Sequence, residues 1–394
     1  MEEDWGVSGL AHLTGLPDGP PDFSRAAVLA HARSTADEVH RRIGVTVDVA
    51  ELLAGRAALL GLSRRGRVSA GGATRLIAAR DGWCALTLSR SDDVDAVPAL
   101  VEVSAKQEDP WPTVERWFSE RTAAQAVERA RLLGLPAAVL GEAEAAEPVV
   151  RRVGPAVSPS GSAGLLVVDL SSMWAGPLCG RLLARAGATV VKVESRGRPD
   201  GTRAGSPAFF DWMNGGKLCY GADFDEPVRL RALLEVADVV IESSRPAALQ
   251  QRGLGAGDVA AKDGRVWVRI TGHGADGERA NWTAFGDDAA VAGGLVGRSA
   301  DGPVFCGDAI ADPLTGLQAT VVVAESLARG GGEVIDVAMA AVAATYAALP
   351  QMSTENACDA SDPSAPESMP VAGALGADDA LVDRLVAERR LAPC

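Results

Sequence analysis

The chain has 394 residues, 47% of them apolar, and a formal net charge of −14. This length and apolar share predict two folded domains with buried cores and exclude a chain that is disordered throughout. The acidic balance argues against general binding to nucleic acid or to an anionic membrane, since both favour a basic surface. We expect neither as a partner.

Targeting and metal-binding signals are also missing from the sequence. It contains no run of eighteen apolar residues. The first thirty residues include Asp, Glu and Pro, where a signal peptide would have an apolar core. The six cysteines and four histidines form no CxxC pair and no HExxH. We therefore expect a cytoplasmic location, reduced thiols and no metal site, and neither a metalloprotease nor a triad hydrolase.

The first part of the chain, residues 1–150, is predicted to form an α+β domain. Two helical patterns are joined by a short β-branched stretch, and the turn Asp81-Gly82 between two β-rich stretches predicts a hairpin. A longer helix and a last strand follow. The expected elements are helices at 26–42, 50–62 and 111–133 and strands at 45–49, 76–79, 83–88 and 136–140.

The second part of the chain is predicted to be an α/β domain. Residues 151–162 mix charge with Pro, Gly and Ser and indicate an exposed linker. Strands and helices then alternate over 163–348, as an open, mostly parallel Rossmann-like sheet requires. Residues 349–394 are expected to be a polar crossing segment that ends in a short helix. The predicted fold class is thus α/β, with a smaller α+β domain beside the large sheet.

The clearest local unit extends from Leu165 to Glu194. A short apolar strand leads into a Ser-rich turn, and Gly176-Pro177 then opens a helix, because proline is tolerated at the first helical position. A second, β-branched strand follows, so the unit is β-α-β and predicts parallel pairing. Ligands of such sheets bind beyond the carboxyl ends of the strands. We therefore expect a nucleotide-bearing ligand near residues 171–177 and just after Glu194.

Positive side chains follow these strands. Cations at the carboxyl ends of parallel strands suit a phosphate-bearing ligand, although an ordinary solvated rim would also contain them. Glu194 stands where dinucleotide folds hold a ribose, but the turn SSMWAGPLCG lacks the G-x-G-x-x-G glycines, so NAD is the weaker candidate. The cations are Lys192, Arg196, Arg198, Arg203, Lys217 and Arg245.

A second group of candidate residues lies in FCGDAIADPLTGLQ, residues 305–318. Asp312 stands immediately before Pro313, a position that suits the N-cap of a helix. From the spacing alone capping is the simpler explanation, and a nucleophilic carboxylate is the other. Asp308 is a similar candidate that is less well placed.

Residues 163–345 resemble the family III CoA-transferases, which include formyl-CoA and crotonobetainyl-CoA:carnitine transferases and 2-methylacyl-CoA racemases. The matching segments are VVDLSSMWAGPLCGRLLARAGATVVKVE, MNGGK with GADFDEP, ADVVIESSRPAALQQRGLG, RITGHGADG and ADPLTG, in the family's order. Residues 64–140 look like the family's small domain, and ALGADDALVDRLVAE looks like its C-terminal end.

The resemblance implies a function. It makes Asp312 the catalytic aspartate, whose carboxylate attacks an acyl-CoA thioester and gives an acyl-aspartyl anhydride and CoA thiolate. A carboxylic acid acceptor then takes over the exchange through further anhydride and aspartyl-CoA thioester intermediates. The resemblance also implies an interlocked homodimer. It places the contacts to coenzyme A at Trp174, Ala175, Lys192, Arg196, Lys217 and Arg245.

The order of the segments departs from that of the family. The counterpart of the small domain lies ahead of the large domain, whereas the family inserts it after the large domain's main sheet. Residues 5–60 also parallel 293–345 as turn, helix, strand and helix, with a chance likeness between Ala-rich helices as the alternative. The chain thus looks like the tail of one copy fused before a nearly complete second copy. The first copy has no aspartate at the place of Asp312, so we predict one active site per chain.

Two other functions stay open. Racemases of the family use a histidine in the segment that here reads TAFGDD, where Phe285-Gly286 stands; racemisation is therefore disfavoured, although Asp287 and Asp288 are near and His273 lies in another motif. A non-catalytic CoA-binding subunit is an alternative of a different class. The family's glycine-rich loop over the active site corresponds loosely to Ser69–Gly72.

Overall fold

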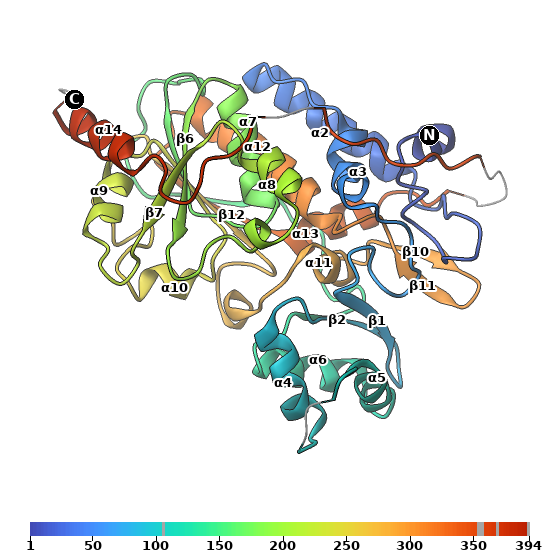
Figure 1. Ribbon diagram of the computed structural model, residues 1–394. Helices are drawn as coiled ribbons and strands as arrows, with labels where there is room; N and C mark the ends of the chain where they lie inside the picture. Colours follow the sequence, from blue (N-terminus) through green and yellow to red (C-terminus); the bar gives the residue numbers. More distant parts are fainter. Residues whose placement is uncertain (105–106, 353–357, 368–369, 392–394) are drawn as a thin grey trace.

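The predicted β-α-β unit forms strand β5 (Leu166–Asp169), helix α7 (Ala175–Arg185) and strand β6 (Thr189–Ser195). The two strands pair in parallel, and helix α7 buries its apolar face on the sheet. The unit belongs to a computed structural model of the chain that describes residues 1–104, 107–352, 358–367 and 370–391. The unit is the start of one large sheet (Figure 1).

This sheet has seven strands in the order β4-β12-β9-β8-β5-β6-β7. All neighbours pair in parallel except β4, which adds antiparallel to β12 at one edge. The predicted α/β class with a mostly parallel sheet is therefore confirmed. The remaining strands are β4 (Val149–Arg152), β7 (Leu218–Ala222), β8 (Val239–Glu242), β9 (Val266–Thr271) and β12 (Glu333–Ala338).

Helices cover both faces of the sheet, because alternate apolar side chains of each buried strand point to opposite sides. Val167, Ile241 and Val268 contribute to the core on one face, whereas Val168, Val240 and Trp267 contribute to the core on the other. The first face carries α2 (Ala27–Ile43), α3 (Val49–Leu60), α7, α8 (Pro207–Asn214), α12 (Ala311–Ala328) and α13 (Met339–Ala347). The second carries α9 (Val228–Val236), α10 (Pro246–Gln250) and α14 (Asp379–Leu391).

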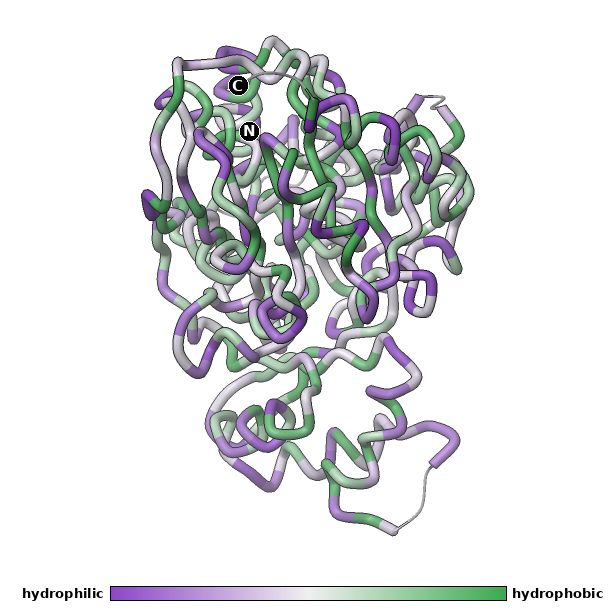
Figure 2. The backbone as a smooth tube through the Cα atoms, turned by 90° about the vertical axis from the view of Figure 1, so that its left-hand side faces the viewer, coloured by the Kyte–Doolittle hydropathy of each residue, from purple (hydrophilic) through white to green (hydrophobic). Residues whose placement is uncertain are grey.

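A small lobe with its own apolar core projects from the main body (Figures 1 and 2). The predicted hairpin is confirmed, since Ala78 pairs with Trp83 across the turn. The helix expected over 111–133 is two helices, because Thr122 and Gln125 form a capping box that starts the second one. The elements of the lobe are β1 (Thr74–Ala78), β2 (Trp83–Thr87), β3 (Ala137–Val139), α4 (Ser91–Val101), α5 (Trp111–Ser119) and α6 (Ala123–Leu132).

Residues 1–62 do not belong to this lobe, which differs from the predicted α+β domain over 1–150. Helix α2 packs against α12, and the buried Arg25 donates to the carbonyls of Val296, Ala347 and Gly294. The amphipathic pattern of a helix predicts that one face is buried but not which body covers it. The independent small unit is therefore 74–139.

The repeat over 5–60 stays a prediction; the structure places helices α2 and α3 in this segment, and α12 and α13 in the segment that it was predicted to parallel. The short strand expected at 45–49 does not form. Asp48 instead caps α3 by accepting the Glu51 N–H at 3.1 Å, and Arg185 donates to the Thr46 carbonyl at 2.8 Å. The segment is extended but has no strand partner, whereas β12, between α12 and α13, lies inside the sheet.

The predicted linker and crossing segment are both attached to the main body. Residues 149–152 form the edge strand β4, and Val153 and Val157 still bond to Gly332 and Gly330. After α13 the chain runs back over the N-terminal segment, where Ser361 donates to the Gly6 carbonyl at 2.9 Å. It then reaches α14, which confirms the predicted terminal helix. Residues 353–357, 368–369 and 392–394 of the expected crossing region lie outside the described part.

Four short elements complete the main body. They are α1 (Glu2–Val7), α11 (Gly286–Ala292) and the antiparallel pair of β10 (Val296–Ser299) and β11 (Gly302–Phe305). Two 3-10 turns lie at Gly201–Ala204 and Glu278–Asn281. Among the described residues, no helix is both long and apolar enough to span a membrane.

Candidate active site

The direction in which the chain crosses the sheet changes between β5 and β8. The chain leaves β5 toward β6 on one side, whereas from β8 it proceeds to β9 on the other. Loops after such neighbouring strands separate and open a ligand crevice at their carboxyl ends. Here the two loops touch where the Ser172 N–H donates to Ser243 Oγ at 3.1 Å.

Asp312 lies at this end of the sheet, in the first turn of α12. It does not cap its own helix: the N-cap position is Ile310, and no side chain caps it. The half-buried carboxylate instead accepts the backbone N–H of Ala175, the first residue of α7. The N-terminus of a helix stabilises negative charge. The N-terminus of α7 faces the Asp312 carboxylate in the way that a helix N-terminus faces a bound anion.

Two glycines allow this close approach. A Cβ atom at Gly286 would overlap Asp312 Oδ2 and the Ala309 carbonyl oxygen. A Cβ atom at Gly316, one turn after Asp312, would come within 2.8 Å of the Ala175 carbonyl oxygen. Since real Cβ contacts are longer, only glycine lets α7, α11 and α12 meet around the carboxylate.

Two further acids and one arginine surround Asp312. Asp308, with its side chain only 1% exposed, receives Nη1 of Arg56 on both oxygens, at 2.6 and 2.7 Å. Asp287 accepts the Ala309 N–H at 2.9 Å. This bond holds Ala309 at φ +43°, a left-handed conformation that most residues avoid. The segment 308–312 is thereby fixed from α11 and from α3.

The electrostatics leave Asp312 poised to change its charge. Burial raises the pKa of Asp312 to about 7; Arg56 opposes the rise, and Asp287 and Asp308 add to it. Burial and then Asp308 raise the pKa of Asp287 to about 6. A carboxylate that is only partly ionised near neutral pH is typical of a functional site.

The predicted covering loop Ser69–Gly72 lies at the same place. Ser69 bonds through its side chain to Asp287. Gly71 faces Arg56, whose Nη2 would be 3.6 Å from a Cβ atom at that glycine. The loop connects α3 to the small lobe, so the N-terminal half contributes both this loop and Arg56 to the site.

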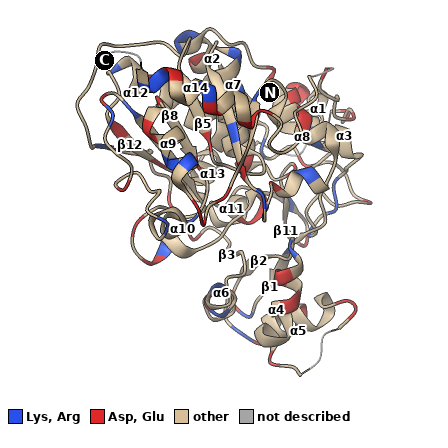
Figure 3. Cartoon of the chain, turned by 60° about the vertical axis from the view of Figure 1, so that its left-hand side comes forward, with Lys and Arg blue, Asp and Glu red and all other residues tan. Residues whose placement is uncertain are grey.

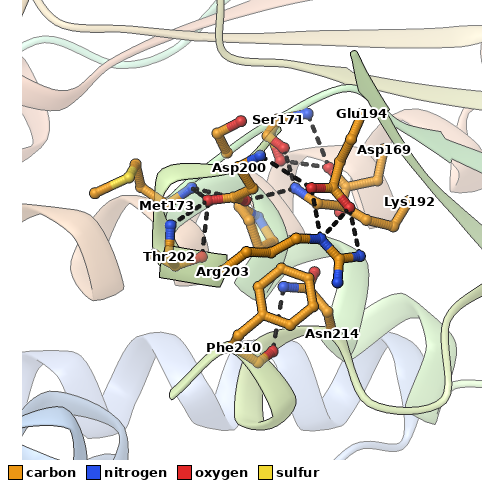
Figure 4. A network of polar contacts seen from close by, with 12 residues as sticks. Asp169, Ser171, Met173, Lys192, Glu194, Asp200, Thr202, Arg203, Phe210 and Asn214 are labelled. Atoms are coloured by element: carbon orange, nitrogen blue, oxygen red, sulfur yellow. Dashed lines mark hydrogen bonds and ion pairs between the residues drawn. The ribbon is translucent and has the colours of Figure 1, made fainter. Parts of the chain in front are cut away.

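The predicted CoA-binding lysines lie in the interior. The side chains of Lys192 and Lys217 are both 0% exposed. Lys192 pairs with Asp200 at 2.8 Å (Figure 4). Lys217 pairs with Asp169 at 2.8 Å. Their ammonium groups are bound by protein carboxylates, so this arrangement does not favour direct contact with a phosphate.

The buried network has a structural effect on the site. Lys192 also donates to the Ser171 carbonyl, and Asp200 accepts the N–H of Met173, which has φ +73° (Figure 4). Both contacts fix the turn that precedes Trp174 and Ala175. The lysines thus position the start of α7 opposite Asp312.

The other predicted CoA contacts differ in exposure. Trp174 is buried, packs edge-on against Phe209 with ring centres 5.3 Å apart, and lies under Arg56. Arg196 is 54% exposed and pairs with Asp379. Arg245 is exposed at the start of α10. Along the ribbon, positions of cations and acids are interspersed (Figure 3).

Phe285 and His273, which were named for the racemase alternative, lie at the start of α11 and beside Trp282. Phe285 precedes α11, and Asp288 caps that helix by accepting the Phe285 N–H at 3.0 Å. His273 packs against Trp282 with ring centres 5.4 Å apart. Burial lowers the pKa of His273 to about 3, with Arg131 and Arg279 adding to the effect. The imidazole is therefore neutral near pH 7.

Arg56 is the functional residue that the sequence reasoning missed. One signal was available, since Arg56 is the single basic residue of the apolar helix predicted over 50–62. A charge among apolar helical positions usually has a buried partner. That partner, Asp308, is 252 positions away in the chain.

The fold and the site together describe an α/β protein whose candidate site is built around one carboxylate. A half-buried carboxylate faces a helix N-terminus at the crevice of a parallel α/β sheet, beside a paired arginine. Among the described residues, no group of His, Cys, Asp and Glu side chains is arranged to hold a metal ion.

The family follows from a comparison of sequences. The model of CoA-transferase family III matches residues 163–380, which is more than half of the chain. The chain belongs to this family. The match covers β5 to α13 and the first residues of α14, and therefore includes Asp312, whereas Arg56 lies outside it.

Characterised relatives match the same part. A succinyl-CoA–D-citramalate CoA-transferase of Chloroflexus aurantiacus is 29% identical over 189 residues, 43% of this chain and 47% of that protein. A succinate–glutarate CoA-transferase of Agrobacterium fabrum is 30% identical over 202 residues, 45% of this chain and 50% of that protein. The chain thus spans about half the length of the curated relatives it matches. The crystal structure of a CAIB/BAIF family protein from Brucella suis is 30% identical, with a TM-score of 0.44, over 48% of this chain and 56% of that one.

Proposed function

We propose that the protein transfers coenzyme A from an acyl-CoA to a carboxylic acid, with Asp312 as the nucleophile. The observation that carries this proposal is the Asp312 carboxylate, half-buried and facing the N–H of Ala175. Membership of family III supports the same chemistry. A homodimer is the assembly that the family resemblance implies.

The proposed reaction begins with attack of the Asp312 carboxylate on the thioester carbonyl. A C–O bond forms, the C–S bond breaks, and an acyl-aspartyl anhydride and CoA thiolate result. The thiolate then attacks the aspartyl carbonyl, which releases the first acid as a carboxylate and leaves an aspartyl-CoA thioester. The acceptor carboxylate displaces the thiolate from that thioester, and a last attack of the thiolate on the acceptor's carbonyl regenerates Asp312.

The surroundings of Asp312 suit these steps. The ionised carboxylate is needed at the start and is the leaving group at the end, so a pKa near 7 balances its reactivity in the two directions. The N-terminus of α7 stabilises the charge whenever it returns to Asp312.

The proposed contacts to coenzyme A are divided into two groups. Trp174, Ala175, Arg196 and Arg245 remain proposed direct contacts. Lys192 and Lys217 are proposed to act indirectly, since Lys192 holds the turn before α7 through the Ser171 carbonyl and Lys217 donates to the Pro177 carbonyl in the first turn of α7. The named relatives use succinyl-CoA or succinate, so succinyl-CoA is the first donor to test.

Trapping of the acyl-enzyme tests the proposal. The protein is mixed with succinyl-CoA and then hydroxylamine, and peptide mass spectrometry is expected to find a hydroxamate on Asp312. Asp312→Asn should abolish it, whereas Glu325→Gln, at the far end of the same helix, should not.

Other outcomes would assign another function. Bound CoA without any adduct would indicate a non-catalytic CoA-binding subunit. Deuterium entry at the acyl α-carbon without exchange of CoA would indicate a racemase. Either result would overturn the proposed transfer.

A further inference from the structure

We propose that Arg56 binds the reacting carboxylate of the acceptor acid, which makes it a specificity residue supplied by the N-terminal segment. The inference rests on the proposed function. It starts from the charges around Asp312, where the described side chains that act on its carboxylate are Arg56, Asp287 and Asp308. An acceptor that arrives as a carboxylate anion meets the acidic side chains of Asp287 and Asp308. Of the three side chains that act on Asp312, Arg56 is the one cation.

The guanidinium has donors left for a ligand. Asp308 takes only Nη1, and in the described part of the chain Nε and Nη2 of Arg56 donate to no protein atom. Among the described residues, neither nitrogen is one of the buried side-chain atoms that lack a hydrogen-bond partner. Since neither nitrogen has a protein partner there, both are accessible to solvent. A planar guanidinium with two free donors matches a second carboxylate.

The orientation of Arg56 is fixed by its neighbours. Its guanidinium carbon lies 5.8 Å from the centre of the Trp174 ring and 5.5 Å from that of Phe209. Asp308 holds the guanidinium through Nη1, and even a Cβ atom at Gly71 would only reach ordinary contact with Nη2, at 3.6 Å. A cation held by aromatic faces and one carboxylate is pre-organised, so little freedom is lost when the ligand binds.

The Arg56–Asp308 pair would have a purely structural role if it only joined α3 to the main body. A comparable pair does join these parts: Arg42 of α2 donates to Glu325 at 2.8 Å, near the opposite end of α12. Arg42 also comes from the N-terminal segment and pairs with an acid on the same helix. It is the matched control, since it lies far from Asp312.

Direct binding of succinate tests the inference without turnover. The parent is Asp312→Asn, whose neutral side chain resembles the acylated aspartate in charge. Calorimetric titration at pH 8 should give a dissociation constant at least ~10-fold higher when Arg56→Gln is added, because the carboxylate loses its charged partner. Adding Arg42→Gln should leave it unchanged.

Arg56→Lys provides a second variant in case Arg56→Gln does not fold, and it should bind with intermediate affinity. Equal binding by the Arg56 variants and the Arg42 control would overturn the inference, as would a parent that does not bind succinate. Succinate binding that depends on Arg56, in a protein that forms no adduct on Asp312, would sink the proposed transferase and leave this inference standing.

Discussion

Asp312 carries an unfavourable charge in the folded protein. Burial raises its pKa from 3.8 to about 7, so ionisation is easier in the unfolded chain than in the native site. The folded state therefore loses stability as the pH rises from about 4 to 7, and the loss then stays constant. Asp312 destabilises the fold at the pH at which it reacts.

Asp312→Asn should thus stabilise the protein at high pH. The amide is neutral and its oxygen still accepts the Ala175 N–H, so we expect a gain on the order of 2 kcal/mol at pH 8. Near pH 4 the gain should disappear, because the wild-type carboxyl is then protonated. Urea unfolding at both pH values measures it, and an equal effect at the two would contradict the assigned pKa.

At this scale the sequence identified part of the site. Asp312 and Asp308 stand in one motif, so local spacing and family resemblance were sufficient to find them. Arg56 acquires its role only through contact with Asp308 across 252 positions, which no local pattern contains. Lys192 lies within β6 and Lys217 directly precedes β7, and the sequence could not show that Asp200 and Asp169 enclose their charges.

At the scale of elements, α7 is positioned by ions beneath it. Although burial opposes its ionisation, Lys217 and Lys192 hold the pKa of Asp169 below its ordinary value. Ser171 also bonds to Asp169, so the pair fixes the end of β5 and the turn beyond it. A fully paired buried network specifies one conformation more than it adds stability.

Removing one ion of this network should be severe. Lys217→Met leaves Asp169 buried without its closest partner, and we expect a loss of about 3–5 kcal/mol in the free energy of unfolding. Lys262→Met is the control, since Lys262 is 31% exposed in its pair with Asp238 and should cost about 1 kcal/mol or less. Comparable losses in the two denaturant titrations would refute the structural role of Lys217.

Most strands and helices of residues 163–348 could be predicted, because apolar runs and helical periodicity are local. The single helix predicted over 111–133 is two helices, because the capping box of Thr122 and Gln125 was not recognised as a helix start. Helix α4 was missed, and Pro98 inside it is the residue that breaks the pattern. The weak point was therefore where helices begin and end.

At the scale of the molecule, the N-terminal segment is part of the main body. Trp5, Leu29 and Leu53 share one apolar core with the sheet, whereas the lobe of residues 74–139 has its own. The predicted boundary near 150 followed chain order, but the packing does not. Composition can mark a linker, yet only contacts decide which segments fold together.

Hydrogen exchange should show this division. Amides of α2 are expected to be protected together with those of α12, and less so with those of α6 in the lobe. Arg25→Met removes three bonds to carbonyls of the C-terminal half and should raise exchange in α2 and α12 together. If mass spectrometry shows that the amides of α2 exchange together with those of the lobe, the predicted domain over residues 1–150 would be supported instead.

The loop of residues 63–73 gives the small lobe a mechanical connection to the chemistry. It leaves α3 just after Arg56, passes Asp287 at Ser69, and enters β1 of the lobe. A second tie joins Thr87 of the lobe to Asp288 at 2.8 Å. Rotation of the lobe about residues 63–73 would move the Ser69 contact to Asp287 and the Thr87 bond to Asp288 together. A displacement of the lobe would therefore act on both acids of α11 at once.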